Sequence, residues 1–186
     1  MRKRSIAIVL LAACLTAACA GPQRSADLLR AQFDAPYLLA SGDRVRVIVF
    51  GQDNLSNSFS IDGAGNISMP LIGLVKAQGL TTADLERAVE QRLRNGFVRE
   101  PRVSIEVEAY RPFFVLGEVT TAGQYPFING MTVQNAVAVA GGFTPRGSQG
   151  DVDITRIVNG RALAFAAPLV FPVRPGDTIT VRERFF

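Results

Sequence analysis

Apolar and polar residues alternate along several short segments of the chain, and this two-residue period is typical of β-strands. In residues 41–50, Val45, Val47 and Val49 alternate with two arginines and an isoleucine. The same alternation marks residues 103–109 and 151–158. Shorter apolar runs predict further strands at residues 59–62, 66–69, 70–75, 113–116, 125–128, 161–166 and 178–184.

Turn residues separate these strands. Gly63-Ala64-Gly65 predicts a hairpin between the two strands that flank it, and Asn159-Gly160 is a strong signal for a two-residue type I′ hairpin turn. Gly-Asp precedes a strand twice, at Gly42-Asp43 and Gly176-Asp177. Glycine can take positive φ there, and aspartate can bond nearby backbone amides. The recurrence is too short to establish an internal repeat.

Two segments have the spacing of amphipathic helices. In residues 81–95 the apolar positions fall at i, i+3, i+4 and i+8 from Leu85, and Thr81 or Thr82, with Asp84 in the first turn, predicts the N-terminal cap.

The charged residues of this helix, Glu86, Arg87, Glu90 and Arg94, lie off the apolar stripe, and we expect them to form a solvated face. A second, smaller helix is expected from Thr132 to the Gly141-Gly142 pair. Many strands and two helices predict an α+β fold.

The first residues have the pattern of a secretory signal. Residues 1–19 contain a basic stretch, an apolar stretch and small residues before a cysteine, and are too short to span a membrane. The pattern resembles a bacterial lipobox, in which the cysteine after the cleavage site is acylated. Leu11-Ala12-Ala13 before Cys14 is the better local match, but cleavage before Cys19 leaves a more normal apolar stretch. We favour Cys19 as the lipidated residue, with cleavage without lipidation as the alternative; residues 20–35 then form a polar tether.

Composition narrows the class of protein. Hydrophobic residues make up 48% of the 186-residue chain and charged residues 19%, which supports a packed core and excludes a disordered class. The formal net charge of +4 owes three positive charges to the signal, so the remaining chain is almost neutral. This balance gives no reason to expect nucleic-acid binding.

The sequence cannot supply a Ser-His-Asp set, a Cys-His pair or a zinc cluster. The chain has no histidine, and both of its cysteines, Cys14 and Cys19, lie in the signal. Glu106 and Glu108 are neighbours on the wet face of a strand, where no burial separates an acid from a base, so we do not favour them as paired catalytic carboxylates. We therefore assign no catalytic, cofactor-binding or metal-binding residue, and expect binding, transport or assembly rather than an enzyme.

Two sets of motifs follow one another along the chain. The first set is YLLASGD at 37–43, VxVxVFG at 45–51, IDGxGxIxMPLIG at 61–73, GLT at 79–81 and PRV at 101–103. The second set is VLGEV at 115–119, GQYP at 123–126, MTV at 131–133 and AGGF at 140–143. Their order resembles the bacterial outer-membrane polysaccharide export proteins, the capsule and exopolysaccharide exporter family.

The resemblance implies a domain organisation and a cellular role. Residues 36–110 would form a small β-rich export domain with one helix, and residues 111–186 a soluble-ligand-binding β-grasp (SLBB) domain with one short helix. The protein would be lipid-anchored on the periplasmic face of the outer membrane. It would form a ring, octameric in the best-known members, through which polysaccharide leaves the cell, and its partner would be an inner-membrane polysaccharide copolymerase. The resemblance implies no cofactor.

The chain differs from longer members in one respect. They carry additional β-grasp domains and a C-terminal amphipathic helix that forms a pore through the outer membrane, whereas VRERFF, ending at Phe186, is no such helix. We therefore expect it either to work with a separate outer-membrane β-barrel or to form only the periplasmic part of the conduit. After the signal, Lys76 is the only lysine. Arginines lining a lumen would suit an acidic polymer, but codon composition is the simpler explanation of this bias.

Two other functions remain open. A monomeric periplasmic module could bind glycan and scaffold or regulate export, and an enzyme could cleave the polymer with Glu106 or Glu108. Phe113 and Phe114 bear on assembly, because strand neighbours point to opposite faces. At least one of the two belongs in the core, and the other then needs a second apolar surface, which a neighbouring subunit would supply.

Overall fold

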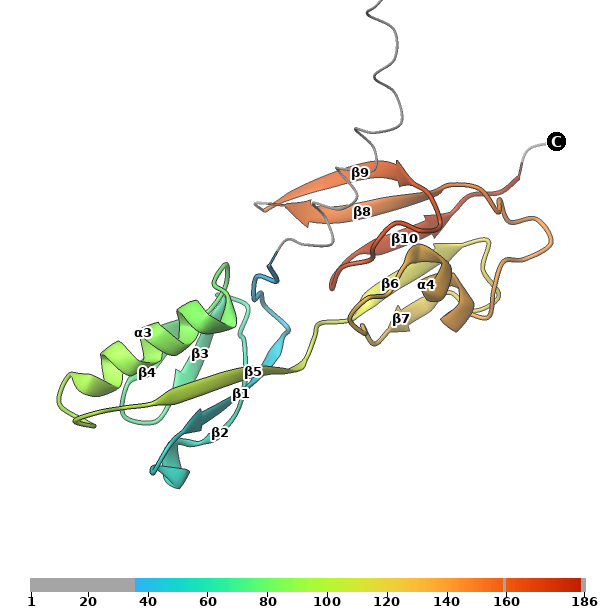
Figure 1. Ribbon diagram of the computed structural model, residues 1–186. Helices are drawn as coiled ribbons and strands as arrows, with labels where there is room; N and C mark the ends of the chain where they lie inside the picture. The colour runs from blue at the N-terminus through green and yellow to red at the C-terminus, as the bar shows by residue number, and fades with distance from the viewer. Residues whose placement is uncertain (1–35, 159, 185–186) are drawn as a thin grey trace, which may run out of the picture. The chain divides into compact units, whose positions relative to one another are not determined.

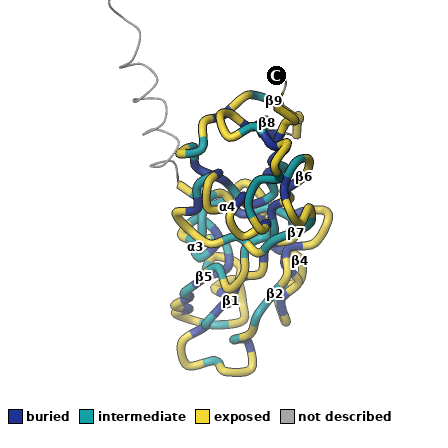
Figure 2. Tube along the Cα trace, turned by 90° about the vertical axis from the view of Figure 1, so that its right-hand side faces the viewer, coloured by how far each residue is buried: buried dark blue, intermediate teal, exposed yellow. Residues whose placement is uncertain are grey.

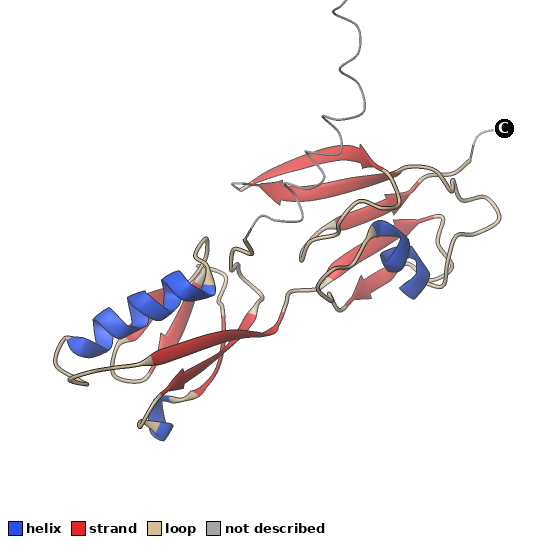
Figure 3. Ribbon diagram, viewed as in Figure 1, coloured by secondary structure: helices blue, strands red, loops and turns tan. Residues whose placement is uncertain are grey.

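Strands dominate the protein, as the computed structural model shows (Figure 1, Figure 3). The structure describes residues 36–158 and 160–184. Its first elements are β1 (Arg44–Val49), the 3-10 helix η1 (Asp53–Leu55), β2 (Asn57–Ser60), β3 (Asn66–Met69), β4 (Gly73–Lys76), α3 (Thr82–Arg94) and β5 (Val103–Ala109). The later elements are β6 (Phe113–Gly117), β7 (Gly123–Tyr125), α4 (Val133–Val139), β8 (Val152–Val158), β9 (Arg161–Ala167) and β10 (Thr178–Val181). The predicted α+β class is confirmed.

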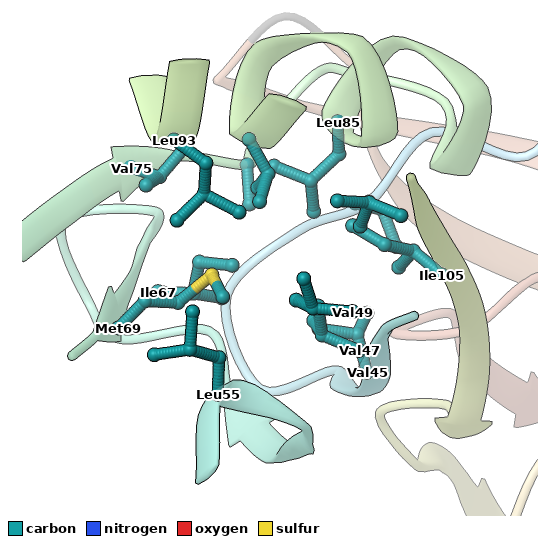
Figure 4. Packing of buried hydrophobic residues seen from close by; sticks show 14 of the residues in the cluster. Val45, Val47, Val49, Leu55, Ile67, Met69, Val75, Leu85, Leu93 and Ile105 are labelled. Atoms are coloured by element: carbon teal, nitrogen blue, oxygen red, sulfur yellow. The ribbon is translucent and has the colours of Figure 1, made fainter. Parts of the chain in front are cut away.

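Strand β1 is the centre of a three-stranded sheet with the order β2-β1-β5, antiparallel on both sides. Its alternation predicts its burial correctly, since Val45, Val47 and Val49 are buried while Arg44 and Arg46 are exposed (Figure 2). Strands β3 and β4 form a separate antiparallel pair. Both sheets and α3 enclose one hydrophobic cluster (Figure 4), whose largest fully buried side chains are Leu39, Leu55, Ile67, Leu85 and Leu93.

Helix α3 begins where the sequence predicts. The Thr81 hydroxyl accepts a hydrogen bond from the Asp84 backbone N–H at 3.1 Å, and the Asp84 carboxylate accepts one from the Thr81 N–H at 3.4 Å. This capping box satisfies two N–H groups that the helix leaves free. The hydrogen bond from the Thr81 hydroxyl is the main reason that the pKa of Asp84 lies below its usual range. Val89 and both leucines of the apolar stripe are buried.

The charged side of α3 is not wholly solvated, which corrects the expectation for two of its residues. Glu86 Oε1 accepts a hydrogen bond from the Ile105 backbone N–H at 2.7 Å, and Glu90 Oε1 accepts one from the Val103 N–H at 3.0 Å. Both N–H groups lie on the side of β5 that faces away from β1. The helix therefore covers part of a sheet edge that would otherwise be open to pairing with another strand.

The later strands form one five-stranded sheet with the order β7-β6-β10-β8-β9. Strands β6 and β10 are parallel, and the other pairs are antiparallel. Helix α4 starts at a second capping box between Thr132 and Asn135. The buried residues of α4 pack with Phe113 and Val115 of β6 in a second hydrophobic cluster, which has no residue in common with the first. The short helix predicted here is thus confirmed.

The hairpin predicted around residues 63–65 is wrong. Strand β2 pairs with β1, whereas β3 pairs with β4. The glycine-rich loop closes on itself, because Asp62 donates its N–H to the Asn66 carbonyl at 2.9 Å and accepts the Asn66 N–H on its carboxylate at 2.8 Å. The chain thereby passes from one sheet to the other. The strand predicted at 70–75 begins only at Gly73, after a turn in which Leu71 has a φ of 67°.

Other strand predictions hold to different degrees. The hairpin predicted between residues 151–158 and 161–166 is confirmed, since β8 and β9 are antiparallel and Val158 pairs with Arg161. The strand predicted at 125–128 lies instead at β7, because Pro126 has no N–H to donate to a ladder. Strand β10 ends at Val181, and the Arg182 carbonyl then accepts the N–H of Ser148 at 2.9 Å in place of a ladder bond.

Candidate functional site

The first Gly-Asp turn holds a fully buried carboxylate. Asp43 is 0% exposed and accepts hydrogen bonds from four donors. The Tyr37 hydroxyl lies at 2.6 Å, the Ala40 backbone N–H at 2.8 Å, the Arg111 backbone N–H at 2.9 Å and the Arg111 Nη1 at 3.2 Å. A buried carboxylate is stable only when it is paired and hydrogen-bonded in this way. Asp43 therefore fastens the start of β1 to the residues that follow β5.

Tyr37 is the second member of this cluster. Its hydroxyl donates to Asp43 and accepts a hydrogen bond from Arg111 Nη1 at 2.9 Å. The guanidinium carbon also lies 5.9 Å from the centre of the Tyr37 ring, within the range of a cation–π contact. Burial, and then the hydrogen bond to Asp43, raise the pKa of the Tyr37 hydroxyl well above its usual value. Tyr37 therefore acts as a neutral donor at any physiological pH.

The second Gly-Asp turn also holds a buried aspartate, which is paired with a different arginine. Asp177 is also 0% exposed and accepts the Arg174 backbone N–H at 2.8 Å. Arg156 reaches it with two parallel hydrogen bonds, from Nε to Oδ1 at 2.9 Å and from Nη2 to Oδ2 at 2.8 Å. The guanidinium carbon lies 5.8 Å from the Phe165 ring centre and 5.6 Å from that of Phe171. Lysine could not replace Arg156 here, because it can neither form two parallel hydrogen bonds with the carboxylate nor stack a planar group on the rings.

The two turns share their backbone geometry. In each, the aspartate N–H donates to the carbonyl three residues earlier at 3.1 Å, and the glycine has positive φ, 91° for Gly42 and 84° for Gly176. Arg111 contacts both turns: a Cβ added to Gly42 would lie 3.4 Å from the Arg111 Cβ, and one added to Gly176 would lie 2.7 Å from its Nε. The repeated Gly-Asp pair therefore marks two similar turns, and Arg111 contacts both of them.

Aromatic rings line up beside this cluster. Tyr37 and Tyr110 are in edge contact, with ring centres 4.9 Å apart at 87°. Tyr110 and Phe127 are in a second edge contact at 5.4 Å and 76°. Asn129 Nδ2 donates a hydrogen bond to the Tyr110 hydroxyl at 3.0 Å. Edge contacts of this kind add to the stabilisation from burial, so Tyr110 is held on both sides.

Sequence reasoning missed the residues of this cluster. It noted the two Gly-Asp turns, but it gave their aspartates no buried role and did not single out Arg111 or Arg156. The available signal was the combination of a turn aspartate with an arginine outside any charged run. The partners lie 68 positions apart in the first case and 21 in the second, so spacing alone could not pair them.

The predicted site residues have different outcomes. Phe113 is 0% exposed in the core, and Phe114 is 39% exposed on the opposite side of β6. Glu108 pairs with Arg44 at 2.8 Å on the surface, and Glu106 is exposed. The lipidation residue Cys19, its alternative Cys14 and the tether lie outside the described residues. Whether Phe114 contacts another subunit stays a prediction.

Two general features concern the described part of the chain only. Within residues 36–158 and 160–184, no helix is long and apolar enough to cross a membrane. The same residues contain no cluster of three or more potential metal ligands among histidine, cysteine, aspartate and glutamate.

Comparison with known families identifies both segments. The family described as polysaccharide biosynthesis/export protein matches residues 31–108, and the SLBB domain matches residues 112–164. The chain therefore carries a segment similar to the polysaccharide export family followed by an SLBB segment, and the resemblance seen in its motifs is confirmed.

Curated relatives agree with this class. The exopolysaccharide production protein ExoF of Rhizobium meliloti (strain 1021) is 32% identical over 90 residues, which cover 47% of this chain and 21% of the relative. The polysialic acid transport protein KpsD of Escherichia coli is 28% identical over 127 residues, which cover 67% of this chain and 23% of the relative. The similarity thus spans less than a quarter of the length of either relative.

Proposed function

We propose that this protein is a periplasmic, lipid-anchored subunit of an exopolysaccharide or capsule export complex. It forms part of the conduit that carries polysaccharide across the outer membrane, as an export domain at residues 36–110 followed by an SLBB domain at residues 111–186. Its partners are the polysaccharide, further copies of itself and an inner-membrane polysaccharide copolymerase.

The observation that carries the proposal is the order of the two families on one chain. An export segment at 31–108 is followed directly by an SLBB segment at 112–164. One relative is an exopolysaccharide production protein and the other a polysialic acid transport protein. Fold alone does not define function, and here the sequence similarity supplies the link to export.

The lipid anchor is argued from Cys19 and the signal that precedes it. Each acyl methylene buried in a bilayer contributes about 0.8 kcal/mol, so several chains on one cysteine hold a protein firmly at the membrane. Metabolic labelling with a radioactive fatty acid should therefore label the wild-type protein and not Cys19→Ser. Labelling retained in Cys19→Ser and lost in Cys14→Ser would assign the anchor to Cys14.

Deletion of the gene tests the export role. The expected result is loss of surface polymer while intracellular polymer is still made, because synthesis precedes transport in this scheme. A plasmid copy of the gene should restore surface polymer. Normal surface polymer in the deletion strain would refute the proposal.

A non-channel glycan-binding module is the second candidate, and the exposed Glu106 beside a cleft favours keeping it. It differs from the first in size. A conduit subunit forms a large closed oligomer in mild detergent, whereas a scaffolding module runs near its monomer mass of 20.0 kDa.

A further inference from the structure

A shallow cleft of about 370 Å³ lies where β5 passes the N-terminal end of α3. Its lining includes Tyr37, Thr82, Glu106 and Tyr110, all of which precede Arg111 in the chain. The volume is within the range of small-ligand sites, which is about 300–1,000 Å³. None of these residues was assigned a role in binding by the motifs or by the family match.

The polar groups of the cleft are available to a ligand. Glu106 is exposed, and within the described residues no ion pair engages its carboxylate. Thr82 is half-buried and, in the same part of the chain, its hydroxyl has no hydrogen-bond partner. The carboxylate only accepts hydrogen bonds, while the hydroxyl both donates and accepts. Together they suit a ligand that carries many hydroxyl groups.

The apolar part of the cleft is aromatic and fixed in position. Tyr37 is held through its hydroxyl by Asp43 and Arg111, so it offers its ring rather than its oxygen. Tyr110 is held by the edge contacts with Tyr37 and Phe127. The electron-rich face of an aromatic ring attracts the weakly positive C–H groups on one side of a sugar ring. Because these rings are already ordered, a ligand would lose little affinity to ordering them.

We propose that this cleft binds sugar units of the exported polysaccharide. Glu106 and Thr82 hydrogen-bond sugar hydroxyl groups, and Tyr37 and Tyr110 provide apolar surface in the wall of the cleft. The assignment rests on the proposed export function and names one place where the polymer touches the protein.

A bound peptide strand is the competing occupant, and the structure disfavours it. Strand addition needs a run of free backbone groups along a sheet edge. On β5, Glu90 and Glu86 already hold the N–H groups of Val103 and Ile105. The edge is thus occupied next to the cleft, and the remaining space suits a compact unit better than an extended chain.

Tyrosine fluorescence gives a direct test, because the chain has three tyrosines and no tryptophan. Two of the three line the cleft, and Tyr125→Phe removes the third signal. The full-length protein in mild detergent is titrated with oligosaccharides released by partial hydrolysis from the producing strain's own polymer. A saturable change in fluorescence is expected.

Glu106→Gln should weaken this binding by about tenfold, since hydrogen bonds to a charged group are the stronger kind. Glu108→Gln is the matched control, because Glu108 lies two residues along the same strand and outside the cleft lining, and its binding should equal that of the unmodified protein. Both variants change exposed side chains, and Glu108→Gln removes only a surface pair with Arg44, so the two variants should unfold at similar temperatures. No saturable change, equal binding by Glu106→Gln, or equal losses in both variants would overturn the cleft assignment.

Failure of this inference and failure of the proposed function give different results. If deletion of the gene blocks surface polymer but Glu106→Gln binds oligosaccharide normally, only the cleft assignment is wrong. If the deletion strain exports polymer normally, the export function is wrong and the cleft assignment falls with it.

Discussion

The buried carboxylates of Asp43 and Asp177 hold the two Gly-Asp turns in place. On burial, each carboxylate exchanges its hydrogen bonds with water for hydrogen bonds from an arginine and from the backbone. A buried ion pair is weak evidence for net stability, but breaking one is costly because a charge is left without a partner. These residues are therefore more sensitive to substitution than any charged residue on the surface.

Asp177→Ala should lower the free energy of unfolding by about 3–5 kcal/mol, because Arg156 stays buried without its carboxylate. The matched control is Asp153→Ala, whose partner Arg182 is 49% exposed and whose own side chain is 39% exposed. A surface pair of this kind is worth about 0–1 kcal/mol. Urea denaturation measures both. Equal losses in the two variants would contradict the importance of the buried pair.

Tyr37 should make stability depend on alkaline pH. Its folded pKa is raised above the ordinary value of 10.0, so the fold favours the neutral hydroxyl. The stabilisation is fully present below pH 10 and is lost as the pH rises beyond it, because the unfolded chain can release this proton more easily. Ultraviolet absorbance should show one of the three tyrosines ionising only as the protein unfolds. Tyr37→Phe should lack this delayed step, and an unchanged titration curve in that variant would contradict the assignment.

At the scale of elements, α3 does more than cover a core with its apolar stripe. Glu86 and Glu90 accept the N–H groups on the outer side of β5. Edge strands are commonly protected by charges, bulges or covering elements, and here the covering helix supplies hydrogen-bond acceptors of its own. By contrast, β9 is an edge strand whose residues are mostly exposed.

Replacing both glutamates by alanine should speed hydrogen exchange at the Val103 and Ile105 amides and destabilise the protein by about 1–3 kcal/mol for each amide left without a partner. Alanine has the higher helix propensity, so the loss cannot come from the helix itself. Glutamine at both positions keeps a carbonyl oxygen and should restore much of the protection. Gln91→Ala, on the exposed side of α3, is the control. Slow exchange retained in the double-alanine variant would show that these contacts do not protect the edge.

At the scale of the whole molecule, α4 covers one face of the five-stranded sheet, and no other helix of the described residues covers the opposite face. Helix α4 packs on the side that includes Phe113 and Val115. Phe114 and Leu116 point the other way and are 39% and 45% exposed. Exposed apolar side chains that gather on a flat surface often mark an interface. This placement keeps Phe114, and no longer Phe113, as the residue expected at a subunit contact.

Phe114→Arg should shift the protein from a large oligomer toward the mass of a single mature chain in mild detergent, because a charge in an apolar interface is costly. Analytical ultracentrifugation measures the change. Phe50→Arg is the control, since Phe50 is 62% exposed and lies in the segment before α3. An unchanged oligomer in Phe114→Arg would remove Phe114 from the interface, and a monomeric wild-type protein would favour the scaffolding function.

Local interactions explain what the sequence determined by itself. The alternation of β1 and β5, both capped helices, the Asn159-Gly160 hairpin and the α+β class all follow from contacts between residues close in sequence. The family motifs added the class of protein, because their order is legible without coordinates. The adjacent positions of Phe113 and Phe114 predicted that one is buried and that the other faces the opposite side of β6. The sequence did not say which of the two is buried.

Tertiary structure decided the features that join distant segments. These include the parallel pairing of β6 with β10, the change of sheet after β2, the contact of Arg111 with Asp43 across 68 positions, and the use of Glu86 and Glu90 as edge acceptors. A local sequence pattern does not identify the partner of a charged side chain, because several arginines of the chain could pair with a given aspartate. Only the folded backbone brings one arginine to each buried aspartate, and the cost of burying an unpaired charge then makes that pairing specific.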